Sequence, residues 1–390
     1  MSGTHRIDIQ TSRFLDSVRG VSAVIVMLSH VVQIYILPHM ANAGFFDGLW
    51  DILASYAVMA FFVISGFVIT ISILENIERN DGHFKPLEFL ESRLVRLYPP
   101  LLFALLLTIS VYGLIHVTHL NGSDNLFLSG DLYVFREKAV LEWDSILDSV
   151  FFLQGIFAGS PGPTLNGALW SLSFEFWFYI VAMFFTIWIV DKRQFWGGFL
   201  TVGIFVAILY LDRPRFFAFL STWLAGLTWA IIYRKRWVVK TFFRTYLWLL
   251  AGGIAAAVAI LVSQNGLWLL IHPYRTILSY FTQSMICWVT MIIAAQIASR
   301  LEKGSFHFFH AYKLAPFSYT LYLIHFPLLT LAFSFLHHFL HTVSWVYGAI
   351  TGVLLGAIIM LISSHLALFI ENKAMFRKLL AGFFHRAKAS

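Results

Sequence analysis

Ten apolar runs, separated by polar connections, constrain the fold of this chain more than any other feature of its sequence. A helix needs roughly 20 apolar residues to cross the hydrocarbon core of a bilayer, and each run reaches or approaches that length. The pattern predicts an all-α membrane protein with about ten transmembrane helices. We expect these helices near residues 18–38, 51–74, 97–117, 168–190, 195–211, 215–233, 245–263, 276–299, 316–336 and 344–370.

The composition agrees with a membrane environment. Hydrophobic residues make up 59% of the 390 residues and charged residues only 12%, which is more apolar surface than a soluble protein of this size can bury. The single cysteine, Cys287, excludes a disulfide or a thiolate metal cluster within one chain. The net charge of +7 is carried by short basic clusters between the apolar runs, as is typical of membrane orientation. We therefore expect membrane lipids, and no nucleic acid, among the partners.

The distribution of lysine and arginine predicts the orientation of the chain. With the N-terminus in the cytoplasm, the connections on that side hold 21 of the 27 basic residues, and the opposite side holds five. This asymmetry predicts that both termini are cytoplasmic. We expect a transmembrane domain over residues 1–372 and a cytoplasmic basic tail over residues 373–390.

Residues 118–167 form the long connection that this orientation places outside the membrane. Within it, residues 141–157 are apolar at helical spacing but carry too many charges to span a bilayer. Such a segment is typical of a helix at the membrane interface or of a re-entrant helix. We expect one or the other here.

Arg19 and His30 are ionisable residues within the first span, where such groups are costly and commonly functional. Eleven residues return to nearly the same helix face, displaced by roughly 16 Å along the axis. The two side chains cannot touch, and the spacing suits one elongated ligand, such as an acyl-CoA with its phosphates near Arg19 and its thioester near His30. A neutral imidazole can act as a general base toward a hydroxyl. The alternative is that His30 bonds a neighbouring helix and Arg19 extends to the interface.

Arg93 and Arg96 lie at i and i+3 near the cytoplasmic start of the third span. Guanidinium groups match the geometry of phosphate oxygens, so this pair is a candidate site for the phosphates of CoA. The alternative is an ordinary basic anchor at the membrane surface.

Glu175 lies roughly 10 Å below the outer end of the fourth span, at a depth similar to that of His30. A carboxylate there would orient the histidine, exchange protons with it, or bind acceptor hydroxyls, and the alternative is a structural salt bridge. His325 precedes the helix-kinking Pro327 and either faces a cavity or bonds a freed carbonyl.

Two further histidine pairs have i, i+3 spacing, His116 with His119 and His338 with His341. Neither pair has carboxylate or cysteine residues nearby that would complete a metal site. We therefore expect no metal cofactor.

Six segments, in order along the chain, form a recognisable set. They are Phe14-Leu-Asp-Ser-Val-Arg-Gly20 with His30, Phe61-Phe-Val-Ile-Ser-Gly-Phe67, Arg93-x-x-Arg96 with Tyr-Pro, Trp170-Ser-Leu-Ser-Phe-Glu175, Ser318-Tyr through His325-x-Pro327, and Phe369-Ile-Glu-Asn372. Together these segments resemble the acyltransferase-3 family of membrane proteins, which O-acylate bacterial surface and exported polysaccharides and some small molecules. One departure concerns the last segment, where Lys373-Ala374 stands in place of the proline that the family pattern leads us to expect.

The resemblance implies a multi-pass enzyme of the bacterial inner membrane, without a fused SGNH-type domain. The implied donor is cytoplasmic acyl-CoA, most often acetyl-CoA, and the implied acceptor is a hydroxyl of a glycan or lipid-linked glycan, such as O-antigen lipopolysaccharide or an exopolysaccharide. In this scheme the catalytic residues are His30 and Glu175, the CoA-binding residues are Arg19, Arg93 and Arg96, and the acceptor-binding residues are Ser171, Tyr322 and His325.

Other functions remain open from the sequence. Acylation of a small molecule would use the same residues on a different acceptor. A secondary transporter of a small polar solute would also place ionisable groups in the membrane, although the repeat symmetry and broken helices of many transporters are not evident. A sensor or scaffold would use Arg93 and Arg96 only as anchors.

Overall fold

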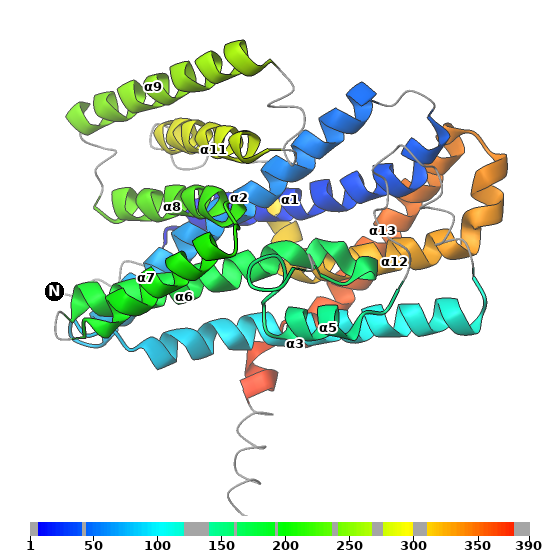
Figure 1. The fold of residues 1–390 in the computed structure, drawn as a ribbon, viewed down its shortest axis with the longest axis horizontal. Coiled ribbons are helices and arrows are strands. Elements are labelled where there is room, and N and C mark those ends of the chain that lie inside the picture. The colour runs from blue at the N-terminus through cyan, green and yellow to red at the C-terminus, as the bar shows by residue number, and fades with distance from the viewer. Residues whose placement is uncertain are drawn as a thin grey trace, which may run out of the picture. The chain divides into compact units, whose positions relative to one another are not determined.

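The computed structural model describes residues 7–40, 44–120, 140–159, 162–191, 194–235, 241–266, 276–298 and 310–377. Each of the ten predicted spans corresponds to a helix in these ranges, which confirms the all-α membrane fold. Eight helices are long and apolar enough to cross a bilayer, and α7 and α11 supply shorter apolar segments. The helices are α1 Ile9–Tyr35, α2 Gly44–Arg79, α3 Pro86–Val117, α6 Trp170–Val190, α7 Trp196–Tyr210, α8 Arg215–Arg234, α9 Thr241–Asn265, α11 Ile277–Ala298, α12 Ala315–Thr342 and α13 Trp345–Ile370 (Figure 1).

The first three helices begin seven to eleven residues before their apolar runs, because helical hydrogen bonding continues through polar flanks. Asp8 caps α1: its Oδ1 accepts hydrogen bonds from the backbone N–H groups of Gln10 and Thr11, at 3.0 and 2.9 Å. Such a cap satisfies donors that the first turn leaves unpaired. At α3 the first helical position is Pro86, where a missing N–H costs nothing.

The chain divides into two compact units that are each discontinuous in sequence. The first unit comprises Met1–Val26, Gly44–Glu78 and Gly203–Ala315, and the second comprises Met27–Ala43, Arg79–Val202 and Pro316–Ser390. The boundary falls within α1, so Arg19 belongs to the first unit and His30 to the second.

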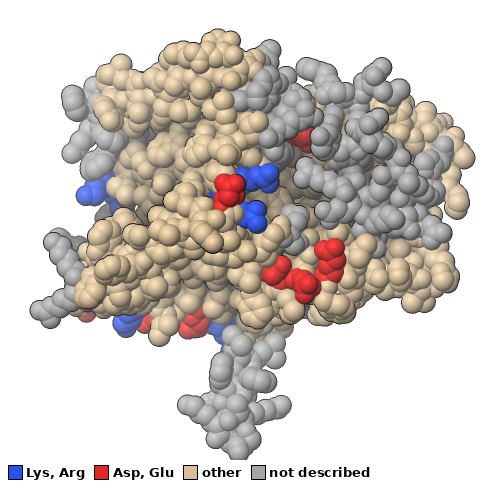
Figure 2. Space-filling model, viewed as in Figure 1, with Lys and Arg blue, Asp and Glu red and all other residues tan. Residues whose placement is uncertain are grey.

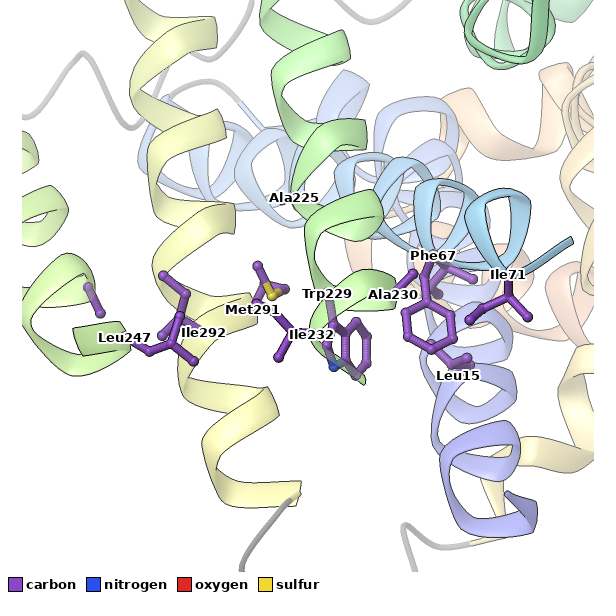
Figure 3. Packing of buried hydrophobic residues seen from close by; sticks show 12 residues of the cluster. Leu15, Phe67, Ile71, Ala225, Trp229, Ala230, Ile232, Leu247, Met291 and Ile292 are labelled. Atoms are coloured by element: carbon purple, nitrogen blue, oxygen red, sulfur yellow. The ribbon is translucent and has the colours of Figure 1, made fainter. Parts of the chain in front are cut away.

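The first unit is built around α8. Its core contains Trp229, whose ring packs against that of Phe67, with centroids 4.7 Å apart (Figure 3). The Phe14 ring lies 6.2 Å from that of Trp229. Helix α11 packs against both α8 and α9 (Figure 1). The backbones of α2 and α8 touch at two glycines, because a Cβ on Gly226 would lie 1.8 Å from the carbonyl oxygen of Val63. Small residues permit such close crossings in membranes.

The second unit packs α13 along the half of α1 that carries His30. Three glycines of α13, at four-residue spacing, face Met27, Val31 and Tyr35 of α1. A Cβ on the first, Gly348, would lie 2.1 Å from the carbonyl oxygen of Tyr35. The Tyr35 hydroxyl also donates to the Leu329 carbonyl of α12, at 2.8 Å. This half of α1 is therefore fixed by both α12 and α13.

Within residues 141–157 the helix α5 covers only Trp143–Val150. It ends because the buried Phe152 adopts a left-handed backbone, with φ of 56°, a conformation uncommon for a bulky residue. The Tyr98 hydroxyl donates to the Val150 carbonyl, at 3.1 Å. Since Tyr98 lies roughly 28 Å along the axis from the end of α3 at Val117, the segment runs deep beside that helix. The re-entrant alternative therefore describes it better than the interfacial one.

Acidic side chains gather over α5 on the face shown in Figure 2. Asp144 and Asp148 lie one helical turn apart. Burial, and to a smaller extent the charge of Asp144, raises the pKa of Asp148. The remainder of the long predicted connection, residues 121–139, lies outside the described residues.

Candidate active site

His30 lies on α1 in the second unit, against two aromatic rings of α12. Its ring stacks on that of His325, with centroids 5.2 Å apart and 29° between planes, and meets the edge of Phe326 at 4.9 Å. The Nδ1 atom of His30 lies 2.8 Å from Gln33 Oε1. Because an amide oxygen can only accept, Nδ1 carries the proton. In the neutral ring, Nε2 therefore keeps its lone pair.

His325 is fixed in the same way. Its Nδ1 lies 2.9 Å from the carbonyl oxygen of Leu321, which again accepts, so the lone pair of the neutral ring is on Nε2. That atom is buried and has no hydrogen-bond partner among the described residues. Pro327 leaves a different carbonyl free, that of Leu323, and this oxygen accepts from Asn166 Nδ2 at 2.9 Å. Two imidazoles thus lie together with both Nε2 atoms suited to accept protons.

Ser171 and Tyr322 extend this pair. Their hydroxyl oxygens lie 2.6 Å apart, and both side chains are buried. The Tyr322 ring lies 6.1 Å from that of His325. The structure therefore brings the three predicted acceptor-binding residues into one chain of contacts that ends at His30.

Glu175 lies one helical turn from Ser171 on α6 and accepts a hydrogen bond from the Tyr179 hydroxyl. Within the described part of the chain, it interacts electrostatically with Arg96, Tyr319 and Tyr322, and neither histidine is among its partners. The predicted similarity of depth does not make Glu175 a neighbour of His30. The structure shows an electrostatic interaction of Glu175 with Arg96 and no salt bridge between them within the described residues, so the predicted roles of Glu175 stay open.

Arg96 lies between two carboxylates of the second unit. Its half-buried side chain interacts electrostatically with Glu175 and with Glu371, which follows α13. Glu371 Oε1 in turn accepts from the backbone N–H and the hydroxyl of Thr320, at 3.0 and 2.6 Å. The Tyr319 hydroxyl donates to the Leu97 carbonyl at 3.3 Å and ties α12 to α3. The surroundings of Arg96 are therefore formed by α3, α12 and the residues that follow α13.

The two other predicted CoA-binding arginines have different surroundings. The Arg93 guanidinium lies over the Phe89 ring at 5.5 Å, and its Nε donates to Ser92 Oγ at 3.1 Å. Arg19, in the first unit, forms an ion pair with Asp16 at 3.4 Å. Arg93 and Arg96 thus share the second unit with His30, and Arg19 does not.

A polar track joins the histidines to the arginines within the second unit. Along α12 its members are His325, Tyr322 and Tyr319, and the first and last are six positions, or roughly 9 Å, apart along the axis. His325 contacts His30 at one end, and Tyr319 interacts with Arg96 at the other. The track has proton acceptors at one end and fixed positive charge at the other.

Three further residues near the site, Gln33, Asn166 and Glu371, were not predicted from the sequence. Gln33 was detectable, because it lies three residues after His30 and therefore on a neighbouring helix position. Asn166 gives no periodic signal, since it lies in the irregular turn Thr164–Leu169 before α6. Its role depends on the distant Pro327.

No group of three metal-ligating side chains lies together in the described residues, among which the side chain of His341 is not included. The functional groups that the structure brings together in this site are histidines, hydroxyls and arginines. A base beside hydroxyl groups is suited to activate an acceptor hydroxyl, and arginines are suited to hold phosphate.

The fold and this polar track define a multi-pass membrane protein with ionisable groups arranged for chemistry inside a helical bundle. The chain belongs to the acyltransferase-3 family, because residues 12–367 match the family profile described as an acyltransferase domain. It is 24% identical over 375 residues to a protein of Shigella phage Sf6 named O-acetyl transferase, and the match covers 91% of this chain and 93% of that protein. No solved structure matches the chain. The protein is thus a membrane acyltransferase, as the resemblance implied.

Proposed function

We propose that this protein moves an acetyl group from cytoplasmic acetyl-CoA to a hydroxyl of a surface or exported glycan, such as O-antigen or an exopolysaccharide, in the bacterial inner membrane. Its family membership and its similarity to a protein named O-acetyl transferase support this proposal. The observation that carries it is the stacked pair of His30 and His325, connected by a polar track to Arg96.

In this mechanism His30 acts at the acceptor hydroxyl. Its Nε2 takes the hydroxyl proton while the oxygen attacks the thioester carbonyl, and the CoA thiolate leaves and is protonated. In the other variant, Nε2 attacks the thioester carbonyl, the C–S bond breaks and the CoA thiolate leaves with the proton from Nδ1. The acceptor hydroxyl then attacks the acyl-imidazole, the N–acyl bond breaks, and the hydroxyl proton returns to the imidazole. The orientation imposed by Gln33 on Nδ1 serves both routes.

The acceptor binds, in this proposal, beside the second histidine. Ser171, Tyr322 and the unpaired Nε2 of His325 present hydroxyl and lone-pair partners to a polyol. Glu175 is one turn closer to Arg96, so we assign it to acceptor hydroxyls at the edge of the site or to holding Arg96, rather than to orienting His30.

The donor binds at the opposite end of the track. Arg93 and Arg96 hold its phosphates through charge-assisted hydrogen bonds, and the pantetheine arm follows the track toward His30. Arg19 is a further phosphate ligand in the predicted scheme, at the cytoplasmic end of the same helix as His30. With both termini in the cytoplasm, the phosphates stay on the cytoplasmic side and the acceptor reaches the other half of the bilayer.

The direct test is acetylation of the glycan in cells that express His30→Ala at wild-type levels. We expect acetylation to fall by a factor of roughly 100 or more, since general bases commonly contribute that much. His116→Ala is a matched control, because this exposed histidine on α3 stacks on Tyr112 of its own helix. Undiminished acetylation in His30→Ala would remove His30 from the mechanism.

A further inference from the structure

The segment that follows α13 carries two basic residues on one side. Asn372 begins a helical turn, and its side-chain Oδ1 accepts from the Met375 backbone N–H at 3.1 Å. The turn continues through Arg377. Lys373 and Arg377 are therefore at i and i+4, which places them on one helix face.

This segment is attached to α3 and α12. Arg377 Nε lies 3.9 Å from Glu91 Oε1 on the first turns of α3. Glu371 is held by the two hydrogen bonds from Thr320 described above. Both attachments lie within the second unit, so the basic face of the segment is fixed next to the N-terminal part of α3, where Arg93 and Arg96 are found.

Lys373 lies among like charges. Its electrostatic partners are three cations, Arg96, Arg93 and Arg377, and one anion, Glu371. We call these four basic residues, Arg93, Arg96, Lys373 and Arg377, the cationic cluster. Three carboxylates lie near the cluster: Glu91 pairs with Arg377, Glu175 interacts with Arg96, and Glu371 accepts from Thr320.

The four cations come from two chain segments and outnumber the three nearby carboxylates, so the cluster favours binding of an anion. A ligand with several negative charges matches this arrangement, and the mixture of guanidinium and ammonium groups suits phosphate oxygens. The mobile, compact charge of a lysine complements the planar arginines, because it reaches a phosphate from any side. The chemistry of the cluster is that of a site for a ligand with more than one phosphate.

We propose that Lys373 and Arg377 complete, with Arg93 and Arg96, the site that binds the phosphates of the acyl-CoA donor. This inference rests on the proposed function and adds two residues to the donor site. Lys373-Ala374 stands where the family resemblance leads us to expect a proline.

The test compares two donors with the purified full-length protein in uncharged detergent, namely acetyl-CoA and acetyl-3′-dephospho-CoA. In Lys373→Ala/Arg377→Ala we expect the KM for acetyl-CoA to rise roughly tenfold, which corresponds to the loss of exposed phosphate contacts, with kcat little changed. The KM for the dephosphorylated donor should rise less, so that the preference for the 3′-phosphate shrinks. Lys373→Arg/Arg377→Lys, which keeps both charges, should restore most of the affinity.

Lys85→Ala is the matched control. Lys85 is an exposed cation that precedes the first turn of α3 and pairs with Glu88 at 3.2 Å, outside the cationic cluster. Unchanged KM values for both donors in the double variant would overturn the inference, as would an equal rise in Lys85→Ala, which would indicate a general charge effect.

Two further outcomes separate the inference from its alternatives. If the double variant loses activity only in vesicles that contain anionic phospholipid, the cluster binds lipid headgroups and the inference is wrong. If the wild-type protein transfers no acetyl group from either donor, the proposed function is wrong. If the wild-type protein transfers acetyl groups and the double variant has the same KM values, only the role of the cationic cluster in donor binding is wrong.

Discussion

The two units of this protein differ in the kinds of polar side chains that they contain among their helices. In the first unit, buried polar side chains are neutral and bond to one another. Ser55 donates to Gln283 at 2.8 Å, and Ser284 lies within 2.9 Å of both Ser221 and Thr222. Such bonds stabilise contacts between helices and provide no proton acceptor for chemistry.

The second unit instead encloses histidine, glutamate and arginine. Charged groups inside a bilayer are costly and persist mainly where function requires them. His30 and His325 hold each other by stacking, while Arg96 lies near Glu175 and Glu371. We propose from this difference that the reaction centre lies in the second unit, whereas the buried polar contacts of the first unit serve packing. The predictions below test this division.

The largest effect on stability is expected in the first unit. Gly226→Leu would force α2 and α8 apart, because even a Cβ lies 1.8 Å from the Val63 carbonyl oxygen. We expect a loss of about 3 kcal/mol or more in unfolding free energy, since overpacking costs about that much, and a low yield of folded protein. Thermal unfolding in detergent measures it. Gly253→Leu on α9, where a Cβ would meet no atom within 4 Å, is the control; equal losses in both variants would contradict close packing at Gly226.

A large loss of activity is expected from His325→Ala in the second unit. Its Nε2 is buried and unpaired among the described residues, and its ring supports that of His30. We expect kcat to fall roughly 100-fold, the scale of acid–base contributions, while the melting temperature changes little. The exposed His338 lies on the same helix, so His338→Ala is the control. Wild-type kcat in His325→Ala would limit its role to packing.

Ser171→Ala and Tyr322→Phe should each weaken acceptor binding roughly tenfold, because each removes one partner of a buried hydrogen bond. The double variant should be little worse than either single variant, since both changes remove the same interaction. The KM for the acceptor in a double-mutant cycle measures this coupling. Strictly additive effects would show that the two hydroxyls act separately.

The smallest effect is expected at the start of α1. Burial alone would raise the pKa of Asp8, but hydrogen bonds from Tyr233 and Thr11 outweigh it and leave the pKa below its ordinary value. The ionised form therefore stabilises the folded protein at neutral pH, and this contribution is lost as the pH falls below about 4. Asp8→Asn should cost about 1 kcal/mol at pH 7 and progressively less at lower pH. A cost that does not change with pH would contradict the role of the carboxylate charge.

The sequence predicted the helices well because the length of an apolar run is a local property. It predicted His30, Ser171, Tyr322 and His325 as members of one site, and the structure brings them together. It did not predict the partner of Glu175. Depth in a membrane follows from residue count, whereas the direction of a side chain depends on how its helix is rotated against its neighbours.

The sequence also did not predict where the helices begin, or which residues outside the spans contribute to the site. Asp8 extends α1 through a polar flank that a search for apolar runs ignores. Asn166 contacts the carbonyl left free by Pro327, a contact between residues far apart in the chain. Glu371 and Lys373 gain their roles only where the end of α13 meets α3 and α12.

The most direct test of the division between the units is acetyl transfer by purified protein with acetyl-CoA and the acceptor glycan, measured for His30→Ala beside Gln283→Leu. His30→Ala should lose roughly 100-fold or more in kcat with an unchanged KM for acetyl-CoA, whereas Gln283→Leu, at the buried polar contact of the first unit, should keep a kcat near wild type in the fraction that folds. Wild-type kcat in His30→Ala would contradict a reaction centred in the second unit.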